Sequence, residues 1–126
     1  MSDNNQNIFS NLEKYNNKIA LYENDRISYS YRDILKFGNE FKYLKREKSL
    51  ILILCDNTFE TVSTYINLIR LNQTVFLLSN NLEKNFFLNI IKKYYPKYLF
   101  LSKNYKINFV NKFYKINKEF KNNIFY

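Results

Sequence analysis

Three apolar runs recur at a regular interval, and they constrain the fold of this chain more than any other feature. The runs are Leu50–Leu54, Thr74–Leu78 and Tyr98–Leu101, and each begins 24 residues after the one before it. Continuous apolar, β-branched and aromatic runs of this length are typical of strands that are buried on both faces. The spacing leaves room for one helix in each connection, as a parallel crossover requires. The sequence therefore predicts an α/β fold with a parallel β-α-β-α-β layer.

The segments between these runs have the pattern of amphipathic helices. In the first segment the apolar residues at helical spacing are Val62, Tyr65, Ile66 and Ile69. In the second they are Phe87, Ile90, Ile91 and Tyr94. We expect Asn57 with Glu60 to cap the first helix and Asn80 with Glu83 to cap the second. Pro96 is expected to end the second helix.

The chain before the first run is expected to begin with a helical segment and a β-hairpin. Up to about Asn17, one face of a short helix would carry Ile8, Phe9, Leu12 and Tyr15. The β-favouring runs Lys18–Tyr22 and Ile27–Ser30 then flank Glu23–Arg26, whose Asn and Asp suit a tight turn. These features predict a hairpin that precedes the parallel layer.

A helix from Tyr31 to about Lys45 is predicted next. Ser30 followed three residues later by Asp33 has the form of a capping box. The apolar residues then recur at helical spacing: Ile34, Phe37, Gly38, Phe41 and Leu44. We expect this helix to cover the core.

After Ser102 the pattern becomes irregular. Tyr105–Val110 suits one more strand, Lys112–Lys121 is basic and loosely organised, and Ile124–Tyr126 is apolar. An apolar end of this kind, if exposed, would be an unpaired strand edge. We assign the chain to a single partial domain with three parts: an N-terminal helical segment (1–17), the hairpin with the β-α-β-α-β core (18–101) and a basic C-terminal segment that ends in a strand (102–126).

Missing residue types exclude several kinds of chemistry. The chain has no His, which excludes Ser-His-Asp and Cys-His catalysis and zinc sites built on imidazole. Cys55 is the only cysteine and closes an apolar run, so we expect a buried, unreactive thiol. Gly38 is the only glycine, and a phosphate-cradling loop needs several. We therefore expect no catalytic, cofactor-binding or metal-binding residue in this chain.

The acidic residues have a structural interpretation. Asp25, Asp33, Asp56 and Glu60 fall at predicted turns and helix starts. Carboxylates at these positions bond free backbone amides and interact favourably with the helix dipole. We expect them to act as caps and not to form an acidic site.

The formal charge of +9 at pH 7 invites a nucleic-acid interpretation. The composition offers another explanation, because the chain is rich in Asn, Lys, Ile, Tyr and Phe, whose codons are rich in A and T. A base bias of the genome raises the Lys content at solvated positions without any ligand. We interpret the charge mainly as a property of the surface.

The sequence gives no sign of a membrane span or a secretion signal. Leu50–Cys55 is the longest apolar run and is too short to cross a bilayer. Met1–Asn7 has no basic region followed by an apolar stretch. We expect a cytoplasmic protein that does not bind membranes.

Five stretches of the sequence occur in the order found in a known superfamily. They are Lys18–Leu21, Ile27–Leu35, Asn57–Val62, Thr74–Leu78 and Pro96–Phe100. Together they resemble the N-terminal region of the AMP-binding, adenylate-forming synthetases, which include acyl-CoA synthetases, peptide-synthetase adenylation domains and luciferases. The resemblance covers nearly the whole chain from Asn16 onward. It departs from the family at Leu71–Gln73, where the family has a glycine, and in lacking a proline after the next strand.

This resemblance implies an N-terminal fragment of an AMP-dependent ligase, which activates a carboxylate with ATP and passes the acyl group to a thiol. Asn122–Tyr126 resembles the strand before the family's phosphate loop, so that loop, the Mg²⁺-binding acid and the acyl pocket would follow Tyr126. ATP and Mg²⁺ are thus implied for the full-length family and not for this segment alone. We expect the chain to be inactive by itself, with the remainder of a split synthetase as a candidate partner.

Two alternatives stay open. A nucleic-acid-binding module would use basic and aromatic side chains around the third run: Lys84, Lys92, Lys93, Lys97, Lys103, Lys106, Tyr94, Tyr95 and Tyr98. We favour the interpretation in which Tyr94 and Tyr98 lie in the core and the lysines are solvated, so nucleic acid is not the expected partner. A protein-interaction module would instead complete its sheet with a partner through Ile124–Tyr126.

Overall fold

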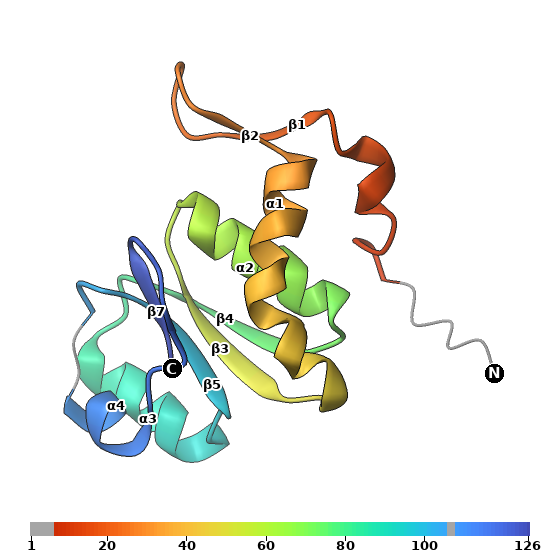
Figure 1. Ribbon diagram of the computed structural model, residues 1–126. Coiled ribbons are helices and arrows are strands. Elements are labelled where there is room, and N and C mark those ends of the chain that lie inside the picture. The colour runs from red at the N-terminus through yellow and green to blue at the C-terminus, as the bar shows by residue number, and fades with distance from the viewer. Residues whose placement is uncertain (1–6, 106–107) are drawn as a thin grey trace.

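The computed structural model describes residues 7–105 and 108–126. Its central feature is a five-stranded sheet with α1 and α2 on one side and α3 and α4 on the other (Figure 1). The helices are η1 (Leu12–Tyr15), α1 (Tyr31–Phe37), η2 (Gly38–Arg46), α2 (Phe59–Arg70), α3 (Lys84–Tyr94) and α4 (Asn108–Phe113). The strands are β1 (Ile19–Tyr22), β2 (Ser28–Ser30), β3 (Leu50–Cys55), β4 (Thr74–Ser79), β5 (Tyr98–Ser102), β6 (Lys118–Glu119) and β7 (Asn123–Phe125).

The strand order of the large sheet is β4-β3-β5-β7-β6. β3 pairs in parallel with both β4 and β5, which confirms the predicted parallel layer and its strands. β7 then pairs antiparallel with β5 and with β6, so the sheet is mixed. The molecule therefore has the expected α/β class with an antiparallel extension on one side.

The sheet separates two hydrophobic cores. Successive side chains of β3 point to opposite faces, as in any strand. One core contains Phe41, Leu44, Ile51, Ile53, Leu68, Phe100 and Phe125. The other contains Leu52, Leu54, Phe87, Ile91, Leu99, Leu101, Val110 and Tyr126. The first core lies under η2 and α2 and the second under α3 and α4, so helices cover both faces of the sheet.

The starts of the two crossover helices differ from the predicted caps. α2 is capped by Thr58 and not by Asn57, since the Thr58 hydroxyl accepts a hydrogen bond from the Thr61 amide at 3.3 Å. α3 begins directly after Glu83, whose side chain makes no capping bond. Asn80, the predicted cap of α3, lies before that helix start. The cap prediction was therefore wrong for both helices, although both helices exist.

The end of α3 agrees with the prediction. The helix stops at Tyr94, two residues before Pro96. Tyr95 adopts a left-handed conformation with φ of 46° and donates its amide to the Ile91 carbonyl oxygen. The chain turns there because proline cannot continue the helical hydrogen bonding.

The predicted helix from Tyr31 to about Lys45 is present in two parts. α1 begins with the expected capping box, in which Ser30 and Asp33 each bond the backbone amide of the other. At Gly38 the α-helix gives way to the 3₁₀ helix η2. The boundary coincides with the close approach of α1 to α2 at this glycine.

The hairpin is confirmed, whereas the first helical segment is shorter than expected. β1 and β2 form an antiparallel pair that stands apart from the large sheet. Among residues 7–17, which are the described part of the N-terminal segment, the helix is limited to the short η1, which buries Leu12. An ion pair between Arg70 and Glu13 holds this segment against the end of α2.

The C-terminal part of the chain corrects two expectations. Val110 lies in the helix α4 and not in a strand, while residues 106 and 107 of the expected strand fall outside the described residues. The apolar end is not an exposed edge, because β7 lies between β5 and β6. Tyr126 exchanges two backbone hydrogen bonds with Leu99, at 2.8 and 3.1 Å. The interaction module that would use this end as a free edge thus loses its structural basis.

Leu71–Gln73, between α2 and β4, is held by local polar contacts. Asn72 adopts the left-handed conformation, with φ of 56°, that glycine commonly provides after a helix. Gln73 is buried, and its amide oxygen accepts from the Ser49 amide at 2.8 Å while its nitrogen donates to the Leu44 and Glu47 carbonyl oxygens. This side chain therefore joins the end of η2 to the start of β3.

Substitution of Gly38 should destabilise the protein although Gly38 lies in a helical conformation. A Cβ atom there would lie 2.1 Å from the Asn67 side-chain oxygen. Asn67 is buried and donates to the carbonyl oxygens of Ile34 and Ser63, at 2.8 Å each, so a shift of its side chain would disrupt these two hydrogen bonds. Gly38→Ala is expected to lower the free energy of unfolding by about 1–3 kcal/mol, which urea titration would measure.

The neighbouring exposed position provides the control. Asn39→Ala adds no atoms near α2 and should change the free energy of unfolding by less than about 0.5 kcal/mol. Equal or higher stability of Gly38→Ala, as helix propensity alone predicts, would contradict this packing.

Candidate functional site

The topology indicates that a ligand site, if present, would lie at one edge of the sheet. In open α/β sheets, ligands bind beyond the carboxyl ends of the strands where neighbouring connections diverge. Here β3 continues through α2 to β4 on one side, while β5 lies on its other side. The polar side chains near this point are Asp56, Glu60, Lys103 and Asn123, which we call the carboxyl-edge cluster.

Asp56 is committed to the start of α2. Its Oδ1 atom accepts hydrogen bonds from the Thr58 amide at 3.3 Å, from the Thr58 hydroxyl and from the Thr61 hydroxyl. These contacts fix the turn between β3 and α2. The predicted capping role is confirmed for Asp33, whereas Asp56 supports the cap residue Thr58 and Asp25 is exposed in the hairpin turn.

Glu60 has a different role from the predicted cap. Its side chain is only 8% exposed, and both carboxylate oxygens accept from the Asn122 amide, at 3.2 and 3.1 Å. Burial raises the pKa of Glu60, an effect that backbone hydrogen bonds from Asn122 and Lys121 oppose. Glu60 therefore anchors the turn between β6 and β7 to α2, across 62 positions of sequence.

The other two members of the cluster differ in burial, because Lys103 is partly exposed and Asn123 is not. Lys103 forms an ion pair with Glu119 at 3.1 Å. Asn123 is fully buried, and neither polar atom of its side chain has a hydrogen-bond partner among the described residues. Asn123 and Phe125 share one face of β7, because they are two residues apart. The cluster thus contains carboxylates held by backbone amides and hydroxyls, and no carboxylate left free to act as a base.

Cys55 lies at the end of β3 beside this cluster. Its thiol is half-buried and contacts the Ile53 carbonyl oxygen at 3.7 Å. Burial raises the pKa of Cys55, which keeps the thiol protonated at neutral pH and lowers its nucleophilicity. The structure supports the expected unreactive thiol, although the residue is less buried than predicted.

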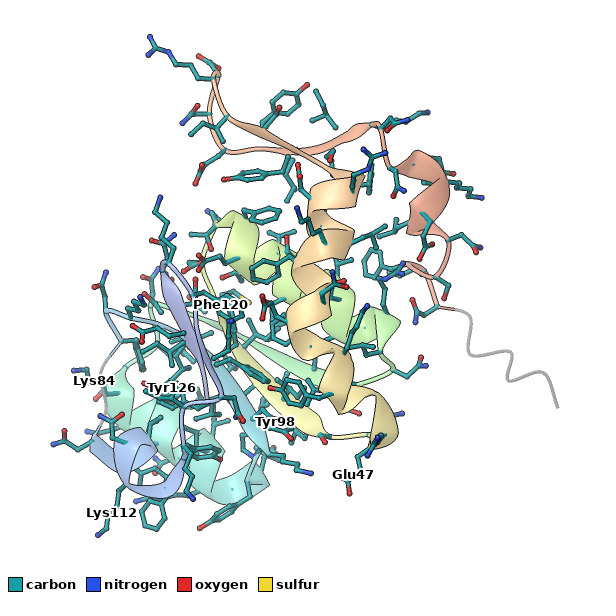
Figure 2. All side chains as sticks on the ribbon, in the orientation of Figure 1. Glu47, Lys84, Tyr98, Lys112, Phe120 and Tyr126 are labelled. Carbon is teal, nitrogen blue, oxygen red and sulfur yellow. The ribbon has the colours of Figure 1, made fainter. Side chains whose placement is uncertain are left out.

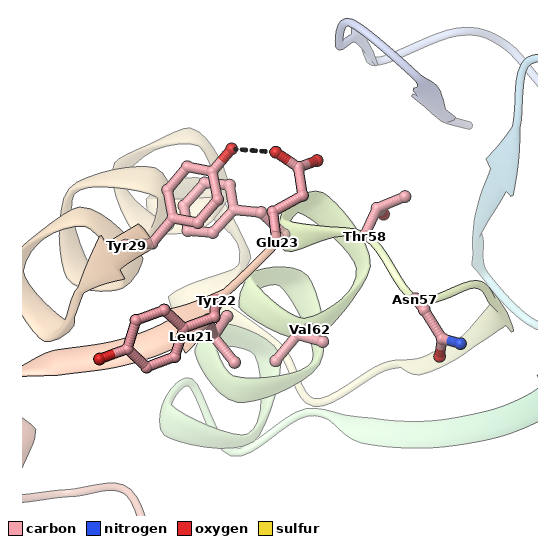
Figure 3. A pocket seen from close by; sticks show the side chains of 8 residues that line it. Leu21, Tyr22, Glu23, Tyr29, Asn57, Thr58 and Val62 are labelled. Carbon is pink, nitrogen blue, oxygen red and sulfur yellow. Dashed lines mark hydrogen bonds between the residues drawn. The ribbon is translucent and has the colours of Figure 1, made fainter. Parts of the chain in front are cut away.

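A small hollow lies between the hairpin and the start of α2 (Figure 3). It has a volume of about 130 Å³ and is lined by Leu21, Tyr22, Glu23, Tyr29, Asn57, Thr58, Phe59 and Val62. The Tyr29 ring stacks on Phe59 at 4.0 Å, and its hydroxyl donates to Glu23 at 3.2 Å. Pockets for drug-sized ligands measure roughly 300–1,000 Å³. This hollow is therefore too small for a nucleotide. The sequence carried no signal for it, because its two walls come from separate elements.

The structure separates the residues that the sequence grouped as a nucleic-acid site. Lys97 pairs with Glu47, Lys103 pairs with Glu119, and Tyr98 stacks on Phe125 under the α2 side of the sheet. Lys106 lies outside the described residues. The remaining members stay together on and just after α3, where they are exposed: Lys84, Lys92, Lys93, Tyr94 and Tyr95. The lysines are solvated as we expected, but Tyr94 is 48% exposed and was wrongly assigned to the core.

Within residues 7–105 and 108–126, no three His, Cys, Asp or Glu side chains gather as a metal site would require. No helix in the same ranges is long and apolar enough to cross a membrane.

Comparisons with protein-family models, curated proteins and solved structures give no match to this chain. Any functional assignment therefore depends on the residues and structure of this chain.

The buried carboxyl of Glu60 should make stability depend on pH. A group whose pKa is higher in the folded state binds its proton more tightly there, so folding loses stability as pH rises from 4.5 through the raised value. Glu60→Gln removes this titration and keeps an acceptor for the Asn122 amide. We expect the stability of Glu60→Gln relative to the parent to increase with pH across that window and then to stay constant. Urea titrations between pH 4 and pH 8 would measure it.

Glu83→Gln is the control for the loss of one negative charge, because Glu83 is exposed. A constant difference between Glu60→Gln and the parent at all pH values would show that burial does not govern this carboxyl.

Proposed function

We propose that this chain is the N-terminal scaffold of an adenylate-forming synthetase and that it does not adenylate carboxylic acids by itself. The observation that carries the proposal is an ordered succession of elements. A hairpin and a capped helix precede β3, α2, β4, α3 and β5. The stretches that resemble the superfamily fall, in order, on β1, on β2 with α1, on the start of α2, on β4 and on β5.

The position of β7 is compatible with this role. β7 contains most of Asn122–Tyr126, the stretch that resembles the strand before the family's phosphate loop. Its pairing with β5 and the bonds between Tyr126 and Leu99 fix the backbone at the amino end of β5. In the proposal, a phosphate loop contributed by the rest of the synthetase starts from this fixed position.

The chain's own residues do not suit catalysis of adenylation. One glycine cannot form a loop whose amides surround triphosphate oxygens. The carboxylates of the carboxyl-edge cluster are held by internal hydrogen bonds or burial. ATP and Mg²⁺ would therefore be bound by the remainder of the synthetase, which is the proposed partner.

The isolated chain is expected to show no adenylation activity. Because phosphoryl chemistry depends on electrostatic stabilisation of the phosphates, carboxylate-dependent ATP–pyrophosphate exchange should not exceed a reaction without protein. An intact adenylating synthetase assayed in parallel shows that the conditions support exchange. Robust exchange by the chain alone would contradict the proposal.

This chain is expected to complement a synthetase fragment that lacks its own N-terminal part. Co-expression with a synthetase fragment that begins at its phosphate loop should allow the two polypeptides to co-purify and to catalyse exchange. The fragment should be one that regains activity with its own N-terminal part, and an unrelated α/β protein serves as the negative control. Failure with several such fragments would count against kinship with the superfamily.

A further inference from the structure

The net positive charge of the protein comes from one part of the chain. Residues 1–83 contain ten Lys or Arg and ten Asp or Glu, so their formal charge is zero. Residues 84–126 contain ten Lys and one acidic residue, Glu119, and so account for the whole charge of +9. A base bias acts along the entire chain and does not explain why acidic residues are missing from this part. The charge distribution therefore requires another explanation.

Three lysines of this segment are neutralised by ion pairs, with Glu47, Glu119 and Glu40. The exposed lysines of α3 and α4 have no ion pair among the described residues: Lys84, Lys92, Lys93 and Lys112. Figure 2 shows Lys84 and Lys112 directed outward on the side of the sheet that α3 and α4 cover. The uncompensated charge therefore gathers on one helical layer.

Aromatic rings alternate with these charges. The Lys92 ammonium lies 5.4 Å from the centre of the Phe109 ring, and the Phe109 and Phe113 rings contact each other in a tilted arrangement with their centres 4.5 Å apart. The Lys112 ammonium lies 5.6 Å from the Phe113 ring. Phe113 is nevertheless 57% exposed, so this ladder of side chains includes a ring with free surface. We call these four residues, with the neighbouring Lys93 and Tyr95, the basic–aromatic face.

We propose that the basic–aromatic face binds single-stranded nucleic acid. Lysines along the face neutralise backbone phosphates, and an unpaired base stacks on the exposed Phe113 ring and extends the ladder. Tyr95 is 68% exposed and offers a second ring beyond the end of α3. This inference does not rest on the proposed synthetase role.

The composition of the face favours nucleic acid over a lipid surface. An interfacial helix presents a continuous apolar side to the membrane. α3 instead buries Phe87 and Ile91 in the core and exposes amides such as Asn85 and Asn89 between its lysines. Exposed amides can bond base edges, whereas they would weaken insertion into lipid.

Fluorescence anisotropy with a labelled, unstructured single-stranded 20-mer tests the proposal. The parent chain should bind it, with an affinity that falls as salt rises. Replacing Lys92, Lys93 and Lys112 by Gln together should reduce the slope of log affinity against log salt by about 2, since each phosphate contact contributes about 0.7. Phe113→Ala should weaken binding by about tenfold without changing the slope, because stacking is independent of salt.

Matched variants separate this face from general effects of charge and aromaticity. Replacing Lys14, Lys36 and Lys42 by Gln removes the same charge from η1, α1 and η2, and should leave the slope within about 0.5 of the parent. Tyr22→Ala removes an exposed ring from the distant hairpin and should leave affinity unchanged (Figure 1). Urea titration of each variant confirms that it remains folded.

Three results would overturn the proposal. The first is absence of binding by the parent chain at 50 mM salt, and the second is an equal loss in the two triple-lysine variants. The third is that the parent chain binds vesicles containing phosphatidylserine more tightly than it binds the oligonucleotide, and that Phe113→Ala weakens both. That result would assign the face to membranes. Duplex DNA should bind more weakly than the single strand, because its bases cannot stack on Phe113.

Discussion

The burial of the four central residues of β3 is the constraint on which the rest of the structure depends. Ile51, Leu52, Ile53 and Leu54 have no solvent exposure, so both faces of the strand and both of its edges must be covered. The edges are covered by β4 and β5, and the faces by helices of the two crossovers. Both neighbours of this strand run parallel to it, and the helices that connect the strands lie on opposite faces of the sheet. This combination is compatible with few other topologies. The remaining elements are additions to this arrangement.

Sequence patterns predicted the elements whose structure is determined by local interactions. Continuous apolar runs identified the three parallel strands, and Ser30 with Asp33 identified the start of α1. The caps of α2 and α3 were missed by one to three positions, because several residues before each helix have suitable side chains. Sequence alone also predicted that carboxylates at helix starts are structural, which the hydrogen bonds of Asp56 support.

Elements fixed by distant contacts were not predictable in the same way. Tyr105–Val110 has the composition of a strand, yet Phe109 and Phe113 meet one helical turn apart and Val110 is buried in α4. β7 enters the sheet only because β5 has a free edge to receive it. Glu60 looks like a cap from its neighbours, whereas its partner Asn122 lies at the other end of the chain. Tertiary packing decided each of these cases, and no local pattern records it.

The two proposals concern different surfaces around one sheet. A synthetase remainder would join at Tyr126, where β7 meets the amino end of β5, whereas the basic–aromatic face lies on the outer side of α3 and α4. Val110, beneath that face, packs in the same core as Tyr126, so both surfaces are supported by one set of buried side chains. Substitutions of exposed Lys or Phe side chains on the helices leave that core intact. Loss of one binding activity therefore need not affect the other, and the shared core ensures that a folding defect would affect both.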